Sequence, residues 1–335
     1  MLYSVKWTTL CATVLIFVSG NIFAQTPISA TLDNGQILIQ GSGFGTTNPM
    51  LFWDDVDSAY AADQATPGMQ VPISANHKWS ADSRTWGSRF TYAQDANTLS
   101  GLPGAYYAGS GHQNYLGSPN HPKVPSLVHK IYVSWWYKPG MSPRAEGGSN
   151  KFIRIWDDGN GLGTRISWTQ MHLTCEDTVS WGDWNGKVGE WNRHEIWVDL
   201  SQQQVRTWVN GVAGHNANCP KSTAYPDKLL YVGLVGFDHG SEAYRSMTTA
   251  IDDIYVGSSP ARVEISDAAT WSLTAKRQLL PVVSWSNNQI RVAIHPGPLR
   301  LGADSYIYVF DAQGNTHTQG IKINCAACPR SPIVQ

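Results

Sequence analysis

Residues 190–211 read EWNRHEIWVDLSQQQVRTWVNG and have the most specific strand pattern of the chain. A first run rich in Trp, Ile and Val ends at Leu200, a polar SQQQ segment follows, and a second such run ends at Asn210-Gly211. Aromatic and β-branched residues favour strands, and a short polar segment between two such runs indicates a hairpin. The stretch therefore predicts two antiparallel strands joined by a polar turn.

Similar strand-like segments occur on both sides of this hairpin. In chain order they are LFWDDV from residue 51, KIYVSWWYKPG from 130, NKFIRIWDD from 150, RISWTQMHL from 165, KLLYVGLVGF from 228 and AIDDIYVG from 250. No stretch shows the sustained i, i+3, i+4, i+7 spacing of apolar residues that is typical of an amphipathic helix. The chain is therefore predicted to be all-β, which argues against all-α and doubly wound α/β architectures.

The composition agrees with a β-rich fold and excludes two classes of partner. Only 15% of the 335 residues are charged, whereas there are 31 Gly, 15 Trp and 14 Tyr, and the formal net charge is −1. Nucleic acid and anionic membranes attract clustered positive charge. Neither is therefore an expected partner.

The first 24 residues, MLYSVKWTTLCATVLIFVSGNIFA, have the three regions of a secretory signal peptide. They carry one positive charge at Lys6, an apolar run from about Leu10 to Val18, and small or polar residues before an expected cut after Ala24. The apolar run is too short to span a bilayer. We therefore expect a secreted protein (extracellular, cell-surface or periplasmic) with no membrane insertion after signal cleavage.

Export would place the remaining cysteines in an oxidising compartment. These are Cys175, Cys219, Cys325 and Cys328, and sequence alone cannot choose among their three pairings. The economical choice is Cys175–Cys219 with Cys325–Cys328. The second pair, in the sequence CAAC, could instead be half of a metal site or a redox pair.

Taken in order, the segments from Leu51 to Val256 resemble a concanavalin A-like jelly roll of the laminin-G and polysaccharide-lyase kind. The hairpin of residues 190–211 is common in that fold and is the most specific part of the resemblance. In that architecture the first and last strands lie side by side. The resemblance therefore implies that Trp53–Val56 and Ile251–Val256 are adjacent antiparallel strands.

The segments outside the jelly roll resemble an immunoglobulin-like module of the TIG type. The turn GSGFG at 41–45 follows a strand pattern at 36–39, and two more alternating segments occur at 289–294 and 306–309. Neither terminal piece alone has the roughly seven strands of such a sandwich. We therefore expect a small immunoglobulin-like β-sandwich with a two-sheet jelly roll inserted in it or flanked by it. The predicted parts are 1–24 signal peptide, 25–50 plus 257–328 immunoglobulin-like domain, 51–256 jelly roll and 329–335 tail.

Strand alternation predicts a polar and aromatic patch, because residues i and i+2 share a face of a strand. One expected face carries Ile166, Trp168, Gln170 and His172, and a matching face of a neighbouring strand carries Phe152, Arg154 and Trp156. The tripeptide Gln170-Met171-His172 is similar to the Q-I-H motif in the groove of jelly-roll alginate lyases. Two further motifs of that family, R-x-E-L-R and Y-x-K-x-G-x-Y-x-Q, do not occur.

The patch suits β-elimination of an acidic polysaccharide. Arg154 and Gln170 would neutralise the sugar carboxylate, His172 would remove the C5 proton, and Tyr244 or Tyr137 would protonate the leaving oxygen. Trp156, Trp168, Trp181 and Trp184 would bind sugar rings. The alternative is that these side chains are half-buried strand residues or plug the ends of the sandwich.

The acidic residues bear on two other kinds of site. Glu195 and Asp199 share a strand face, but the E-x-D-x-x-E run of jelly-roll glucanases is absent, which argues against a retaining hydrolase. Asp54-Asp55 and Asp252-Asp253 fall at strand ends that are expected to be adjacent. Such oxygen clusters suit a structural Ca²⁺ ion, and plain solvated strand ends are the alternative. No other cofactor is expected.

These observations predict a secreted carbohydrate-active protein that engages an extracellular polysaccharide. As an enzyme it would be a polysaccharide lyase. Two other classes stay open: a non-catalytic carbohydrate-binding or adhesion protein, and a surface structural protein.

Overall fold

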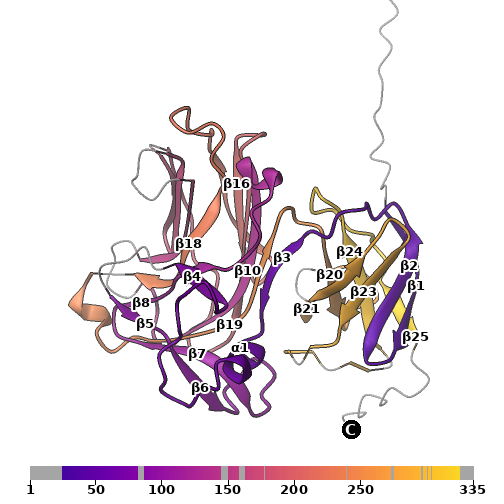
Figure 1. Ribbon diagram of the computed structural model, residues 1–335, viewed down its shortest axis with the longest axis horizontal. Coiled ribbons are helices and arrows are strands. Elements are labelled where there is room, and N and C mark those ends of the chain that lie inside the picture. Colours follow the sequence, from indigo (N-terminus) through magenta and orange to yellow (C-terminus); the bar gives the residue numbers. More distant parts are fainter. Residues whose placement is uncertain are drawn as a thin grey trace, which may run out of the picture.

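The computed structural model describes residues 25–81, 87–144, 150–157, 163–176, 178–238, 240–272, 275–295, 297–299, 301–302 and 304–324. The regular structure in these residues is almost entirely β (Figure 1), which confirms the predicted fold class. The exceptions are the short helix α1 (Asp57–Ala62) and two 3₁₀ turns, η1 (Pro125–Val128) and η2 (Glu242–Tyr244). No helix in the described part of the chain is long and apolar enough to cross a bilayer.

The strands form three large sheets and one small one. The inner sheet has the order β17 (Val212–Asn218), β16 (Gln204–Val209), β15 (Asn192–Asp199), β10 (Lys130–Pro139), β19 (Thr248–Gly257), β7 (Gly104–Ser110) and β6 (Thr91–Asp95), and β3 (Met50–Asp54) also pairs with β19. The outer sheet has the order β14 (Thr178–Trp181), β13 (His172–Cys175), β12 (Arg165–Thr169), β11 (Lys151–Trp156), β18 (Tyr231–Asp238), β8 (Gln113–Leu116) and β5 (Ser88–Arg89). The small sheet pairs β4 (Trp79–Ala81) with β9 (Ser118–Pro119).

The third large sheet, which we call the terminal sheet, joins strands from early and late in the chain. Its order is β21 (Arg277–Leu280), β20 (Arg262–Ser266), β24 (Tyr306–Phe310), β25 (Ile321–Asn324), β1 (Thr26–Asp33), β2 (Gln36–Ser42), β23 (Gln289–Ala293) and β22 (Val282–Trp285). It encloses an apolar core of its own that includes Ile37, Val263 and Ile290. The TIG-type assignment of this part stays a prediction.

The hairpin predicted at residues 190–211 is present as β15 and β16. These strands pair antiparallel from His194 opposite Val209 to Asp199 opposite Gln204. The pairing of the jelly-roll ends is also confirmed, because Trp53 of β3 lies opposite Tyr255 of β19. β3 ends at Asp54, two residues earlier than expected.

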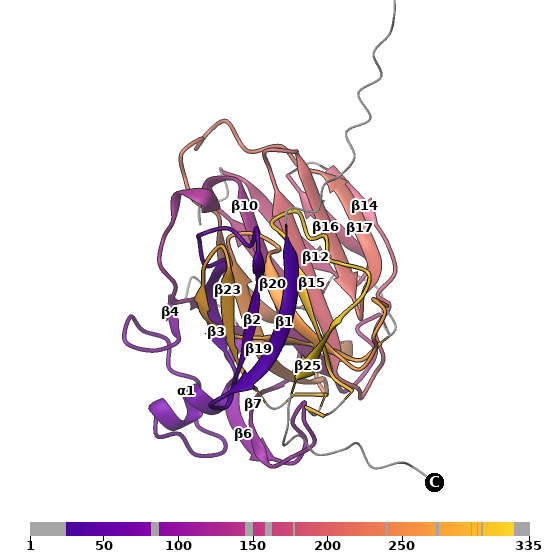
Figure 2. The ribbon, with the colours of Figure 1, turned by 90° about the vertical axis from the view of Figure 1, so that its right-hand side faces the viewer.

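The inner sheet is covered on both of its faces (Figure 1). One face packs against the outer sheet around a core that includes Val133, Trp135 and Ile196 of the inner sheet. On the opposite face, Tyr132 and other aromatic side chains pack with Leu279 of β21. Figure 2 shows terminal-sheet strands such as β1 and β2 in front of inner-sheet strands such as β15 and β19. The outer sheet therefore has one face packed against the inner sheet, and neither of the other two large sheets covers its opposite face.

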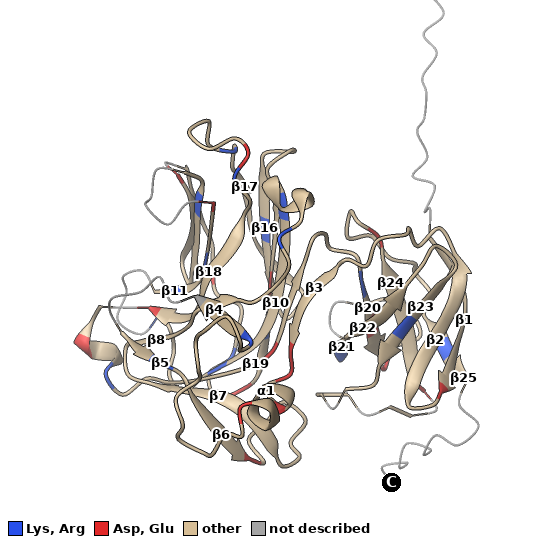
Figure 3. Cartoon of the chain, viewed as in Figure 1, with Lys and Arg blue, Asp and Glu red and all other residues tan. Residues whose placement is uncertain are grey.

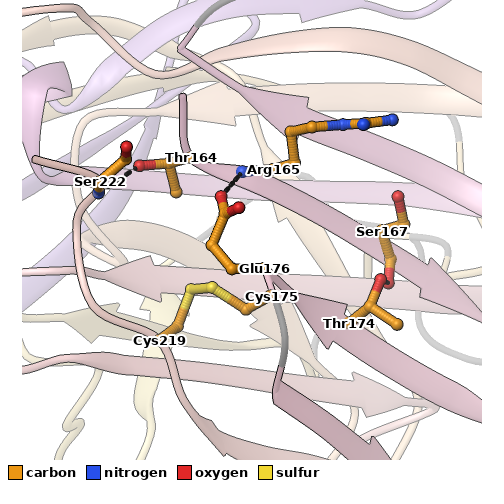
Figure 4. The surroundings of a disulfide bond; sticks show 8 residues. All are labelled: Thr164, Arg165, Ser167, Thr174, Cys175, Glu176, Cys219 and Ser222. Carbon is orange, nitrogen blue, oxygen red and sulfur yellow. Dashed lines mark hydrogen bonds between the residues drawn. A yellow bond between two sulfur atoms is a disulfide. The ribbon is translucent and has the colours of Figure 1, made fainter. Parts of the chain in front are cut away.

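A disulfide joins Cys175, the last residue of β13, to Cys219, the residue after β17 (Figure 4). The two residues are 44 positions apart and their Cα atoms are 5.6 Å apart, so the predicted pairing is confirmed. The bond fastens the outer sheet to the edge of the inner sheet. Cys325, Cys328, the expected signal peptide and the expected tail lie outside the described residues.

Candidate functional site

The outer sheet presents a row of polar and aromatic side chains on the face turned away from the core. In the strand register Lys151 lies opposite both Asp238 and Thr169, and His172 lies opposite Trp181. The row therefore crosses five neighbouring strands, from β18 to β14. Side chains with the opposite orientation on these strands, such as Ile155, Ile166 and Leu173, are buried between the two sheets.

Asp238 holds two cationic side chains on this surface. Arg154 Nη2 donates to Asp238 Oδ2 at 3.0 Å, and Lys151 Nζ lies 3.9 Å from the same oxygen. Gln113 Nε2 donates to Asp238 Oδ1 at 3.3 Å. One carboxylate of β18 thus fixes an ammonium and a guanidinium that both belong to β11. We call Lys151, Arg154, Asp238, His172 and Trp181 together the His172 face.

A β-bulge brings Lys151 and Arg154 to the same face, although simple alternation would separate them. The register of β11 shifts between Lys151 and Ile153 against both neighbouring strands. As a result Phe152 and Ile153 are both buried in the core. The prediction that Phe152 shares a face with Arg154 is therefore wrong, and the bulge is the reason.

The segment RISWTQMHL is a hairpin and not the single strand that the alternation indicated. β12 ends at Thr169 and β13 begins at His172. The Thr169 hydroxyl oxygen accepts hydrogen bonds from the backbone N–H of His172 at 2.9 Å and of Met171 at 3.3 Å, which closes the turn. The predicted common face of Trp168, Gln170 and His172 is therefore wrong.

Trp168 and Gln170, the two residues of that set that do not lie on the predicted face, are buried inside the fold. Trp168 lies in the core, with its ring centroid 5.7 Å from that of Trp135. Gln170 is buried, and its Oε1 accepts a hydrogen bond from the backbone N–H of Asn150 at 2.9 Å. Of the expected Trp–Arg–Gln–His patch, the surface keeps Arg154 and His172.

His172 has the protonation state that a general base needs. Partial burial lowers the pKa of its imidazole, and the nearby Lys151 ammonium lowers that pKa further. The ring is therefore neutral near pH 7 and can accept a proton. Its centroid lies 4.9 Å from that of Trp181, whose side chain is 69% exposed. An exposed indole thus stands directly beside the candidate base.

The other predicted sugar-binding tryptophans are less accessible. Trp156 belongs to the outward side of β11 but is buried, and it lies against Gly233 so closely that a Cβ there would come within 2.1 Å of the indole. Trp184 is half-buried, and its indole N–H donates to His194 Nε2 at 3.0 Å. Trp181 is therefore the one tryptophan of the predicted set that is both exposed and beside His172.

Neither predicted tyrosine is placed to act on the His172 face. Tyr137 is fully buried between the sheets beside Phe152, and this burial raises the pKa of its phenol. Tyr244 is also buried, and its hydroxyl donates to the carbonyl of Pro143 at 2.7 Å. Both tyrosines support the structure around the face and do not reach across it.

Each of the four predicted calcium ligands has at least one contact within the protein, and Asp253 Oδ2 is buried without a hydrogen-bond partner. Asp54 accepts hydrogen bonds from the Trp79 indole N–H at 2.9 Å and the Tyr107 hydroxyl at 2.7 Å. The remaining three bond to near neighbours or to a histidine: Asp55 accepts from Ser58, Asp252 accepts from the backbone N–H of Asp253, and Asp253 lies 2.7 Å from His295 Nε2. Among the described residues no three acidic, His or Cys side chains are grouped to hold a metal ion. Calcium binding at these carboxylates stays a prediction.

Two residues of the His172 face were missed at the level of the sequence. Asp238 is the last residue of β18 and directly follows the segment KLLYVGLVGF, and Lys151 is the first residue of β11. The alternating pattern placed Lys151 opposite to Arg154, because a bulge leaves no signature in a short strand without glycine. Their ion pairs join residues far apart in the chain, which no local pattern reports.

Comparisons with known proteins assign the chain to no family. No protein-family model matches the chain, and no curated protein matches it. One similar solved structure is domain 4 of AbnA, a GH43 extracellular arabinanase from Geobacillus stearothermophilus, in complex with arabinotriose, with 16% identity over 62% of this chain and 92% of that one and a TM-score of 0.36.

Two further structures are comparably distant. The cellulose-induced protein Cip1 has 15% identity over 53% of this chain and 90% of that one, with a TM-score of 0.36. A mutant of the alginate lyase Aly36B in complex with an alginate trisaccharide has 12% identity over 50% and 80%, with a TM-score of 0.30. At these identities and TM-scores the likenesses do not carry a function to this chain.

Proposed function

We propose that this protein binds an acidic polysaccharide on the His172 face and cleaves it by β-elimination. The observation that carries the proposal is the neutral imidazole of His172 on one surface with two cations held by Asp238 and an exposed indole. A base, positive charge for a carboxylate and a platform for a sugar ring are the three elements that this chemistry requires.

The reaction can be written with the groups present on this face. Lys151 and Arg154 contact the carboxylate of a uronic acid and stabilise the negative charge that develops when C5 loses its proton. His172 takes that proton, the C4–O bond to the next sugar breaks, and a C4=C5 double bond forms. Because Tyr137 and Tyr244 are buried in the fold, the imidazolium of His172 itself then protonates the leaving oxygen.

A secreted location accords with this proposal. A disulfide such as Cys175–Cys219 persists in oxidising compartments and is rare in the cytosol. An acidic polysaccharide outside the cytoplasm would be the matching partner.

A non-catalytic binding function is the second candidate. Trp181 is exposed on a sheet surface, and the ion-paired cations beside it would bind a sugar carboxylate without catalysing a reaction. Both candidates predict binding, whereas elimination alone predicts a new double bond.

The test is incubation of the purified protein with alginate, polygalacturonate and hyaluronan. Elimination is expected to produce an unsaturated, ultraviolet-absorbing sugar end with at least one polymer. Binding without this product would support the second candidate. The absence of both binding and product for all acidic polymers would contradict both.

A further inference from the structure

A second polar cluster lies on the opposite side of the inner sheet, at its contact with the terminal sheet. It consists of Arg193 and Glu195 on β15, Arg262 and Glu264 on β20, and Arg277 on β21. All five side chains are buried. Figure 3 shows basic positions on β20 and β21, the strands that face the inner sheet.

Glu264 is the centre of this cluster. Its Oε1 accepts hydrogen bonds from Arg262 Nε at 2.6 Å and Arg193 Nη2 at 2.8 Å, and its Oε2 accepts one from Arg277 Nη1 at 3.1 Å. Burial alone would raise the pKa of Glu264, but the three guanidinium groups outweigh burial and hold the pKa well below its usual range. Glu264 is therefore ionised.

Glu195 is the second anion of the cluster. Its Oε1 lies 3.2 Å from Arg193 Nη2 and accepts a hydrogen bond from the Tyr132 hydroxyl at 2.6 Å. Burial would raise its pKa, but Arg193 and Arg262 lower it, so this carboxyl is ionised as well. Both acids thus carry a full negative charge.

A cavity of about 350 Å³ opens beside this cluster, between the inner and terminal sheets. Its lining includes Glu195, Arg262 and Arg277 from the cluster and adds Arg206 of β16. The lining thus holds three arginines and one glutamate, so two positive charges are in excess along it. The volume lies in the range of small-molecule binding sites.

Aromatic rings line the same cavity, and an unused donor lies in the adjoining Glu264 network. Trp197, Trp208 and Trp271 are part of the cavity wall. Arg193 is 3% exposed, and its Nη1 is buried without a hydrogen-bond partner. A buried donor without an acceptor is unfavourable, so the surroundings favour an added acceptor.

We propose that this cavity is a binding site for a carboxylated saccharide, separate from the His172 face. The two excess positive charges of the lining select an anionic ligand, and indole walls select one with sugar-ring faces. The ion network by itself accounts for the contact between the sheets. It does not account for an open, tryptophan-lined cavity whose lining carries two excess positive charges.

The experiment measures binding of trigalacturonate by calorimetry to the full exported chain carrying His172→Ala and Arg154→Gln. In this background the His172 face has lost its base and one of its cations. We expect one bound trigalacturonate per chain, weakening of that binding by added salt, and no comparable binding of neutral 4-linked galactotriose.

Single variants in the same background locate the site. Trp208→Ala and Arg206→Gln are each expected to weaken binding about tenfold or more, because both half-exposed residues line the cavity and neither belongs to the Glu264 network. Trp181→Ala removes the same side chain from the other face and is the matched control, with no expected effect. A thermal unfolding curve verifies that each variant is folded.

Several results would overturn this inference. They are equal affinity for galactotriose, unchanged affinity in folded Trp208→Ala and Arg206→Gln chains, or weakening by Trp181→Ala alone. The outcome is independent of the proposed elimination, which is read from the unsaturated product of the wild-type chain. Cavity binding without any product would contradict only the elimination.

Discussion

At the scale of single residues, His172 combines three properties that seldom coincide on a strand surface. It is half-buried, it borders an exposed indole, and the pKa of its imidazole is lowered by partial burial and by Lys151. The surroundings thus make His172 the side chain on which the proposed function depends.

Replacing His172 by Ala is expected to reduce turnover by about 10²–10⁴-fold, because the proton acceptor is lost. Binding of the acidic polymer should persist, since Lys151, Arg154 and Trp181 remain. Product absorbance at saturating polymer and a separate binding assay measure the two effects. If His172→Ala lowers only the melting temperature and the folded fraction keeps full activity, the residue has a packing role alone.

The pH dependence of turnover follows from the same pKa. Only the neutral imidazole accepts a proton, so activity is expected to fall as the pH drops through the lowered pKa of His172, below its ordinary value of 6.5. Lys151→Met removes a nearby positive charge and should move this acid limb to higher pH. Lys187→Met, at an exposed site paired with Glu190, is the control and should leave the profile unchanged. If Lys151→Met leaves the acid limb of the pH profile unchanged, that limb does not report the ionisation of His172.

At the scale of elements, the strand that carries His172 is fastened at its other end. β13 begins at His172 and ends at Cys175, whose disulfide to Cys219 reaches the end of β17. One short strand therefore carries the candidate base at one end and the disulfide that anchors it at the other.

Replacing both cysteines by Ser is expected to lower the free energy of unfolding by about 3–4 kcal/mol, the value for a closed loop of this length in the chain-entropy model. Denaturant titration of the double variant measures the loss. Wild-type protein under reducing conditions should show the same decrease. A loss of less than about 1 kcal/mol in both cases would mean that packing, not chain entropy, holds β13 in place.

The same elements show what a sequence can and cannot predict. The β15–β16 hairpin follows from runs of strand-forming residues. The β3–β19 pairing is implied by the resemblance to a jelly roll, and the Cys175–Cys219 bond is the economical choice among three possible pairings. The faces of β11 and β12 do not follow from the sequence pattern, because a bulge at Phe152 and a turn closed by Thr169 each reverse the alternation that follows. Local geometry of one or two residues thus decided which half of the predicted patch was right.

At the scale of the whole molecule, the contact between the inner and terminal sheets is built from charges far apart in the sequence. Arg193 and Glu264 are separated by 71 positions, yet their side chains are 2.8 Å apart. No charge run or motif marks either residue, and each lies in an ordinary strand pattern. This cluster therefore could not be predicted from the sequence and is recognised only in the folded structure.

Glu264→Gln is expected to destabilise the protein strongly, by about 3–5 kcal/mol, because three buried guanidinium groups lose their shared counterion. Chemical unfolding measures the change. The matched control is Asp33→Asn, which breaks the half-exposed ion pair with Arg291 and should cost less than about 1 kcal/mol. Similar effects of the two substitutions would show that the Glu264 network contributes little to holding the sheets together.

The parallel pairing of β1 with β25 has a mechanical consequence. Ala30 lies opposite Ile323 and Thr31 opposite Asn324, so the first and last described strands are hydrogen-bonded neighbours that run in one direction. A pulling force applied between residues 25 and 324 would slide these strands past each other and load their hydrogen bonds together, in shear. The terminal sheet would carry the tension first, while the inner and outer sheets would stay unstrained until it ruptured. A chain gripped by its ends would thus keep the His172 face intact under load.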